Sequence, residues 1–162
     1  MPRFDPQTAL IAMELQQIVA EFAHEVDANG GANIAEFYAE DGEFAVGDYT
    51  HKGRAAIRKF YADRAQRIPA SHKDGVRVSA HTFLNVRVHV EDENRATVYF
   101  TNVNYAGEGH PPVLGTINPA MVTDCRMAFR READGNWRIV VFGGKPLFVG
   151  NDPFLNKQLL KS

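Results

Sequence analysis

The sequence predicts one α+β domain over residues 1–162, a curved antiparallel β-sheet with three N-terminal helices on its concave face. Two patterns lead to this prediction. Apolar residues recur at helical spacing in the first half of the chain, and runs rich in Val, Phe and Tyr follow in the second half. Helices that precede a series of strands are typical of an α+β fold, and 162 residues suit one domain.

Three helices are expected in the first half. The first covers residues 8–28, before Asn29-Gly30-Gly31, and its apolar stripe consists of Leu15, Ile18, Val19, Phe22 and Val26. A short second helix is expected at residues 32–39. The third covers residues 54–68 and ends before Pro69, and its apolar stripe consists of Ile57, Phe60, Tyr61, Ala65 and Ile68.

The strands are expected in one short and four long segments. The short strand lies at residues 43–46, and the long ones lie at residues 76–90, 95–105, 120–132 and 136–149. A sheet of such strands curls, and helices on its concave face leave a cone whose open end is a pocket for a small apolar molecule. The Gly- and Pro-rich joint at 106–119 is predicted to be a functional loop. The apolar tail, in which Pro153 can start a short helix, is expected to close the pocket or an interface.

Composition excludes several classes of partner and cofactor. The net charge is -2 without a basic or acidic block, which argues against a nucleic acid or a membrane surface as partner. No HExxH, Cys/His cluster, P-loop or GxGxxG occurs, so the sequence predicts no metal and no nucleotide cofactor. Cys125 is the single cysteine and the start MPRFDPQTAL has no long apolar core, so a cytoplasmic location is expected.

Asp27 and His81 are the candidate catalytic pair. Asp27 ends the first helix, and His81 opens the strand-like run HTFLNVRVHV. A carboxylate beside an imidazole orients the ring and stabilises its protonated form, which is the arrangement of a general-base dyad. The strand pattern places Val86 and Val88 on the opposite face from His81, so the dyad requires a bulge between residues 82 and 85. The alternatives are a helix-capping Asp27 and an inert histidine at the core edge.

Two pairs of alternating polar residues are candidates for substrate binding. Asp124 and Arg126 share one face of the third long strand, where they form either a polar floor to the pocket or a surface salt bridge. As part of a floor, Arg126 would bind a leaving group or an oxyanion. Asn102 and Asn104 share a face of the second long strand and either donate to a substrate oxygen or solvate the strand end.

The ordered motifs of the chain resemble the SnoaL-like branch of the nuclear-transport-factor-2-like superfamily. The matching segments are VDANGGANIAEFYAEDGEF (26–44), HKGRAAIRKFY (51–61), AHTFLNVRV (80–88), ATVYF (96–100) and DGNWRI (134–139). The resemblance implies a cystatin-like cone made of helices and a curved sheet. It implies much less about the reaction, because the superfamily contains isomerases, dehydratases, hydrolases and non-catalytic binders.

Within this branch, the chain is similar to scytalone dehydratase, bile acid 7α-dehydratase and hexachlorocyclohexane dehydrochlorinase. Such enzymes pair an Asp at the end of the first helix with a His at a strand start, and the matching positions are Asp27 and His81. The chain departs from scytalone dehydratase at Val26, where a tyrosine is expected. It departs again at Asp124 and Arg126, where uncharged polar residues are expected, so the substrate does not carry over.

The predicted function is therefore a cofactor-free lyase or isomerase that takes a proton from a small hydrophobic, cyclic substrate. One alternative is a non-catalytic ligand-binding or assembly module, like the small subunit of ring-hydroxylating dioxygenases. Another is an enzyme resembling ketosteroid isomerase or polyketide cyclases, with a carboxylate base such as Asp124. A homodimer or homotrimer is also expected, formed through the convex face, because helices can cover only one face and both strand faces carry apolar residues such as Phe83, Tyr99, Met127 and Phe129.

Overall fold

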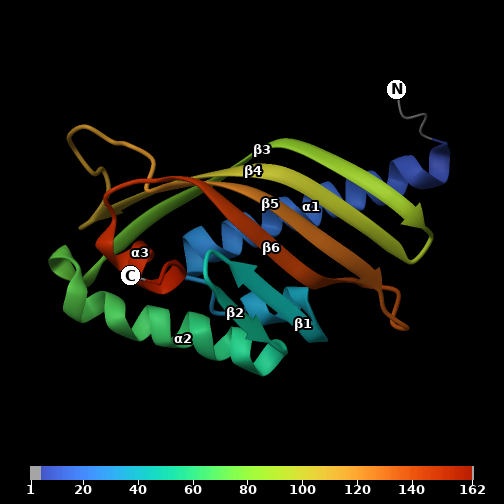
Figure 1. Cartoon of the computed structure of the whole chain (residues 1–162), viewed down its shortest axis with the longest axis horizontal. Coiled ribbons are helices and arrows are strands. Elements are labelled where there is room, and N and C mark those ends of the chain that lie inside the picture. The colour runs from blue at the N-terminus through green and yellow to red at the C-terminus, as the bar shows by residue number, and fades with distance from the viewer. Residues whose placement is uncertain (1–4, 162) are drawn as a thin grey trace.

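A computed structural model describes residues 5–161 and has the predicted α+β architecture. Its single sheet has six strands in the order β2-β1-β6-β5-β4-β3. The long strands are β3 (Arg77–Asp92), β4 (Arg95–Glu108), β5 (Met121–Arg131) and β6 (Trp137–Val149). They curve over α1 (Pro6–Asn29), and α3 (Pro153–Leu159) lies beside one end of α2 (Arg54–Ser71) (Figure 1).

The sheet is mixed, which corrects the expectation that all of its strands are antiparallel. Strand β1 (Tyr38–Val46) is antiparallel to β2 (Tyr49–Lys52) but parallel to β6, with Phe44 opposite Phe142. A hairpin forces antiparallel pairing, whereas strands far apart in the chain can pair in either direction. The short strand expected at residues 43–46 is the end of β1, which begins earlier, at Tyr38.

The helices also differ from the prediction. Two N-terminal α-helices are present instead of three, because the segment expected as the second helix forms only a 3-10 turn, η1 (Ile34–Phe37). The buried carboxylate of Glu25 accepts a hydrogen bond from the backbone N–H of Asn33 at 2.7 Å, which anchors this turn to α1. The third α-helix lies in the tail and begins at Pro153, as the sequence suggested. Helix α2 continues through Pro69 to Ser71, although Pro69 has no N–H to donate to the carbonyl of Ala65.

A β-bulge in β3 decides which side chains face the helices. The register shifts between Leu84 and Arg87, and Asn85 has a positive φ of 55°. Asparagine adopts this left-handed conformation more readily than most residues. Because of the bulge, His81 before it and Val88 after it both lie on the concave face. A bulge of the kind that the dyad required is therefore present, although it lies between residues 84 and 87 and not between residues 82 and 85.

The main core lies between α1 and the concave face of the sheet. Leu15 of α1 is buried there with Met127 and Phe129 of β5. Met127, Phe129 and Phe83 therefore lie on the concave face, whereas Tyr99 is partly exposed on the convex face. Within residues 5–161, no helix is long and apolar enough to cross a membrane. The first four residues of the expected non-secretory start lie outside the described range.

Candidate functional site

Asp27 and His81 lie in direct contact at the inner end of the cone. The Asp27 Oδ1 atom is 2.6 Å from His81 Nδ1, and Oδ2 accepts a hydrogen bond from the backbone N–H of His81 at 2.7 Å. The hydroxyl of Ser79, two residues earlier on β3, donates to Oδ1 at 3.0 Å. The carboxylate is thus fixed by groups from one strand face. The two residues are within hydrogen-bond distance, as their places in the sequence predicted.

The electrostatics of the pair favour an ionised carboxylate. Partial burial raises the pKa of Asp27, but the hydrogen bond and charge of the His81 ring outweigh it and lower the pKa below its usual value. In the neutral form of the ring, an ionised Asp27 accepts the Nδ1 proton and the lone pair lies on Nε2. Asn104 Nδ2 lies 2.5 Å from this Nε2 and is its donor.

His81 and Asn104 line a partly open cavity of about 70 Å³ between α1, α2, α3 and the sheet. Most of its wall is apolar, formed by Phe22, Val26, Phe44, Val46, Phe60, Phe83, Met121, Cys125, Phe142, Leu155 and Leu159. Its polar wall groups are Tyr61, Arg64, His81, Asn102, Asn104, Thr123 and Gln158. Since α3 supplies Leu155, Gln158 and Leu159, the tail forms part of the cavity wall.

Only some of the predicted binding residues reach the cavity. Asn102 and Asn104 line it, and the side-chain oxygen of each is buried without a hydrogen-bond partner in the described chain. Asp124 and Arg126 are exposed on the convex face, so the polar floor predicted from them does not exist. Alternation showed that these two share a face but not which face. The neighbouring Cys125 takes the cavity side instead.

The remaining candidates behave as ordinary structural residues. Burial raises the pKa of the Cys125 thiol to about 12, so it is packed and not nucleophilic. His24 is exposed on the far side of α1, as its place opposite the apolar stripe predicted. His110 is exposed in the loop after β4 and does not line the cavity. Within residues 5–161 no group of three or more His, Cys, Asp or Glu is arranged to hold a metal ion.

Arg64 is the cavity residue that the sequence interpretation missed. It is buried, with 6% of its surface exposed, whereas Ala65, which was placed in the apolar stripe, is exposed. Arg64 follows Ile57 by seven residues and Phe60 by four, so helical spacing puts it on the stripe that faces the sheet. A positively charged residue on the stripe that faces the sheet is the signal that could have identified Arg64 from the sequence.

A family model for the SnoaL-like domain matches residues 7–142 of the chain. The match covers most of the domain, including Asp27 and His81. The chain belongs to the SnoaL-like domain family. A comparison with curated proteins finds no match.

Solved structures support the same fold for this SnoaL-like protein. An NTF2-like protein with a cystatin-like fold from Novosphingobium aromaticivorans is 24% identical, with a TM-score of 0.66 over 98% of this chain and 99% of that one. A candidate scytalone dehydratase from the same species is 13% identical, with a TM-score of 0.67 over 88% and 87%. ActVI-ORFA from Streptomyces coelicolor is 14% identical, with a TM-score of 0.69 over 85% and 97%. At these identities the similarity shows the fold alone.

Proposed function

We propose that this SnoaL-like protein is a cofactor-independent lyase or isomerase that removes a proton from a carbon atom of a small hydrophobic, cyclic molecule. One observation carries the proposal: the His81 ring contacts Asp27 through Nδ1 at 2.6 Å and belongs to the wall of an apolar cavity. A neutral imidazole held in one tautomer by a carboxylate is suited to general-base catalysis.

The proposed reaction begins when Nε2 of His81 takes the proton. The C–H bond breaks, an N–H bond forms, and the imidazolium is stabilised by the ionised Asp27. In an elimination, the electron pair of the C–H bond forms a C=C bond while the leaving group departs with its own pair; a departing hydroxide then takes the proton from Nε2 to form water. In an isomerisation, the pair forms an enolate, and the imidazolium returns the proton to another carbon.

Asn104 has a positioning role in this proposal. Its amide now donates to His81 Nε2, the atom that has to accept the substrate proton. Substrate entry therefore requires the amide to turn away from that lone pair. Once Nε2 is protonated, the buried Asn104 Oδ1, which has no partner in the described chain, becomes an acceptor for the new N–H. Asn102, on the same strand face, is the candidate donor to a substrate oxygen.

The test is exchange of carbon-bound hydrogen for solvent deuterium, together with elimination, in a panel of cyclic ketones, alcohols and halides. His81→Gln keeps a hydrogen-bonding side chain but cannot act as the base, so we expect turnover to fall about 10²–10⁴-fold. His24→Gln, an exposed change on α1, is the matched control and should leave turnover unchanged. Wild-type rates in the His81→Gln protein would refute the proposal.

A non-catalytic ligand-binding or assembly module is the second candidate, and the phenylalanine side chains that occupy much of the cavity, such as Phe83 and Phe142, favour it. Phe83 and Phe100 pack with ring centroids 4.4 Å apart beside it. Tight binding of an apolar ligand without turnover of any substrate would select this candidate. The alternative with Asp124 as base is excluded by geometry, because Asp124 is exposed on the convex face.

A further inference from the structure

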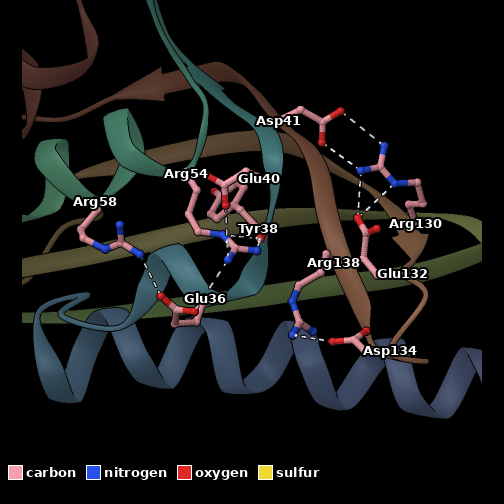
Figure 2. Close-up of polar contacts among 10 residues, drawn as sticks. All are labelled: Glu36, Tyr38, Glu40, Asp41, Arg54, Arg58, Arg130, Glu132, Asp134 and Arg138. Atoms are coloured by element: carbon pink, nitrogen blue, oxygen red, sulfur yellow. Dashed lines mark hydrogen bonds and ion pairs between the residues drawn. The ribbon is translucent and has the colours of Figure 1, made fainter.

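Arg64 is the arginine among residues 5–161 that is buried without an acidic partner; Arg67, Arg87 and Arg126 also lack one, but they are exposed. The arginines in Figure 2 each face a carboxylate, in the pairs Arg54–Glu40, Arg58–Glu36, Arg130–Asp41 and Arg138–Asp134. Arg77, whose side chain is 3% exposed, is paired with Asp152. In residues 5–161 the Arg64 guanidinium makes no ion pair within 4.0 Å and no side-chain hydrogen bond, although the residue is only 6% exposed.

A buried charge without a partner is unfavourable, because the low-dielectric interior does not replace the water it loses. Burial lowers the pKa of Arg64, yet a guanidinium stays protonated at neutral pH. The carboxylates of Asp27 and Asp152 attract this cation from a distance, but neither forms an ion pair with it within 4.0 Å. The side chain lies in the cavity wall with Phe60 and Tyr61 from the same face of α2, so its free donors are available to whatever the cavity holds.

The charges around the cavity favour an anionic ligand. Among the wall residues, Arg64 is the only one of the described residues that is permanently charged, and none is a carboxylate. Asp27 lies behind His81 and is already occupied by three hydrogen bonds. A guanidinium presents paired N–H donors that match the two oxygens of a carboxylate, and a carboxylate is ionised at neutral pH.

We infer that Arg64 is the binding partner of a carboxylate on the ligand, so that the site selects small ring compounds bearing a carboxylic acid over neutral ones. This inference deepens the proposed function by naming the substrate class, and it rests on that function only in placing the substrate in this cavity. The ring lies among the phenylalanines, the carboxylate pairs with Arg64, and the reacting carbon faces His81 in the same wall.

The experiment compares benzoate with its neutral analogue benzamide by NMR titration of the full chain in a buffer free of other carboxylates. We expect the wild-type protein to bind benzoate at least tenfold more tightly, and Arg64→Met to reduce the ratio of the two dissociation constants to within twofold. Arg67→Met removes the same charge from an exposed position on α2 and should retain the wild-type ratio. Arg64→Met should also melt at or above the wild-type temperature, since no ion pair is broken.

Several outcomes would overturn the inference. They are equal binding of the two probes to the wild-type protein, no detectable benzoate binding, or a preference that survives in Arg64→Met or disappears in Arg67→Met. The binding assay involves no turnover, so it separates this inference from the proposed chemistry. His81→Gln should keep the benzoate preference while it loses turnover. If His81→Gln lost turnover and Arg64→Met kept the preference, the proposed function would stand and only the inference about Arg64 would fail.

Discussion

Two acid–base pairs connect β3 to a helix end, and they differ in what they face. Arg77 pairs with Asp152 at the start of α3, and His81, four residues further along the strand, pairs with Asp27 near the end of α1. Both carboxylates are partly buried, with side chains 13% and 23% exposed. Arg77 does not line the cavity, whereas His81 does.

The difference shows that a buried ion pair does not by itself indicate a functional site. Arg77 is always charged, stacks on the Phe154 ring at 4.8 Å and donates toward His72 Nε2 at 3.1 Å, so its contacts hold the tail and the end of α2 in place. His81 can gain and lose a proton, and its second nitrogen faces a space that a ligand can occupy. We therefore expect the first pair to govern stability and the second to govern turnover.

The largest effect on stability is expected from Arg77→Met. The change leaves Asp152 without its main partner, and removal of one member of a buried pair costs on the order of 3 kcal/mol of unfolding free energy. Urea unfolding measures the loss. Arg95→Met, which breaks the exposed Arg95–Asp92 pair, is the control and should cost less than about 1 kcal/mol. Similar losses in both variants would mean that the buried pair has no special structural role.

The second pair is tested by Asp27→Asn, which keeps the shape of the side chain but removes its charge. An amide can donate to Nδ1 and so fix the wrong tautomer of His81, and it no longer stabilises the imidazolium. We expect turnover to fall by about 10²-fold or more. Steady-state rates on a substrate accepted by the wild-type protein provide the measurement. Retention of more than a tenth of the wild-type rate would show that the carboxylate is not part of the chemistry.

A smaller effect on stability is expected from changes at the β3 bulge, which follows both Arg77 and His81 in the chain. A β-branched residue is poorly tolerated at the positive φ of Asn85, so Asn85→Val should lower the unfolding free energy by about 1–2 kcal/mol. Asn85→Gly, which accepts this conformation without strain, should stay within about 1 kcal/mol of the wild type. Because His81 is nearer to the bulge than Arg77, its Nδ1–H NMR signal should change more than the Arg77 Nε–H signal.

The smallest difference between the two pairs is expected at acid pH, where the contribution of each pair to stability should decrease in the same way. Partial burial raises the pKa of Asp27 and of Asp152, but hydrogen bonds from His81 and Arg77 outweigh it and lower both below their unfolded values. The unfolded chain then binds more protons, so each pair stabilises the fold above the unfolded pKa of about 3.9 and loses this contribution as pH falls through the lower folded value. Asp152→Asn should flatten the acid side of the stability–pH curve, and an unchanged slope would contradict this.

The sequence was informative wherever local periodicity was enough. It predicted the long strands and both N-terminal α-helices to within a few residues. The resemblance to the SnoaL-like branch also led to the prediction that Asp27 and His81 lie in contact. It did not identify the parallel pairing of β1 with β6, because no local signal links strands so far apart. For Asp124, the alternating pattern predicted a strand face shared with Arg126, but it did not predict whether the helices cover that face.

Arg64 shows a different limit. Helical spacing places Arg64 on the buried face of α2. Because Arg64 is charged, the predicted apolar stripe included the exposed Ala65 instead. Charged residues are rarely buried without a partner, so the expectation that the buried face of a helix is apolar did not hold at Arg64.

The parallel pairing of β1 with β6 also has a kinetic consequence. Strands β3 to β6 pair with their neighbours in the chain, so these contacts can form by successive local steps. The pair Phe44–Phe142 closes a loop that spans most of the domain, and contacts of this separation slow folding because the chain entropy is lost before they form. Both rings belong to the cavity wall. We therefore expect the cavity to be completed late in folding, so that a ligand that binds there adds to native stability by acting only on the folded state.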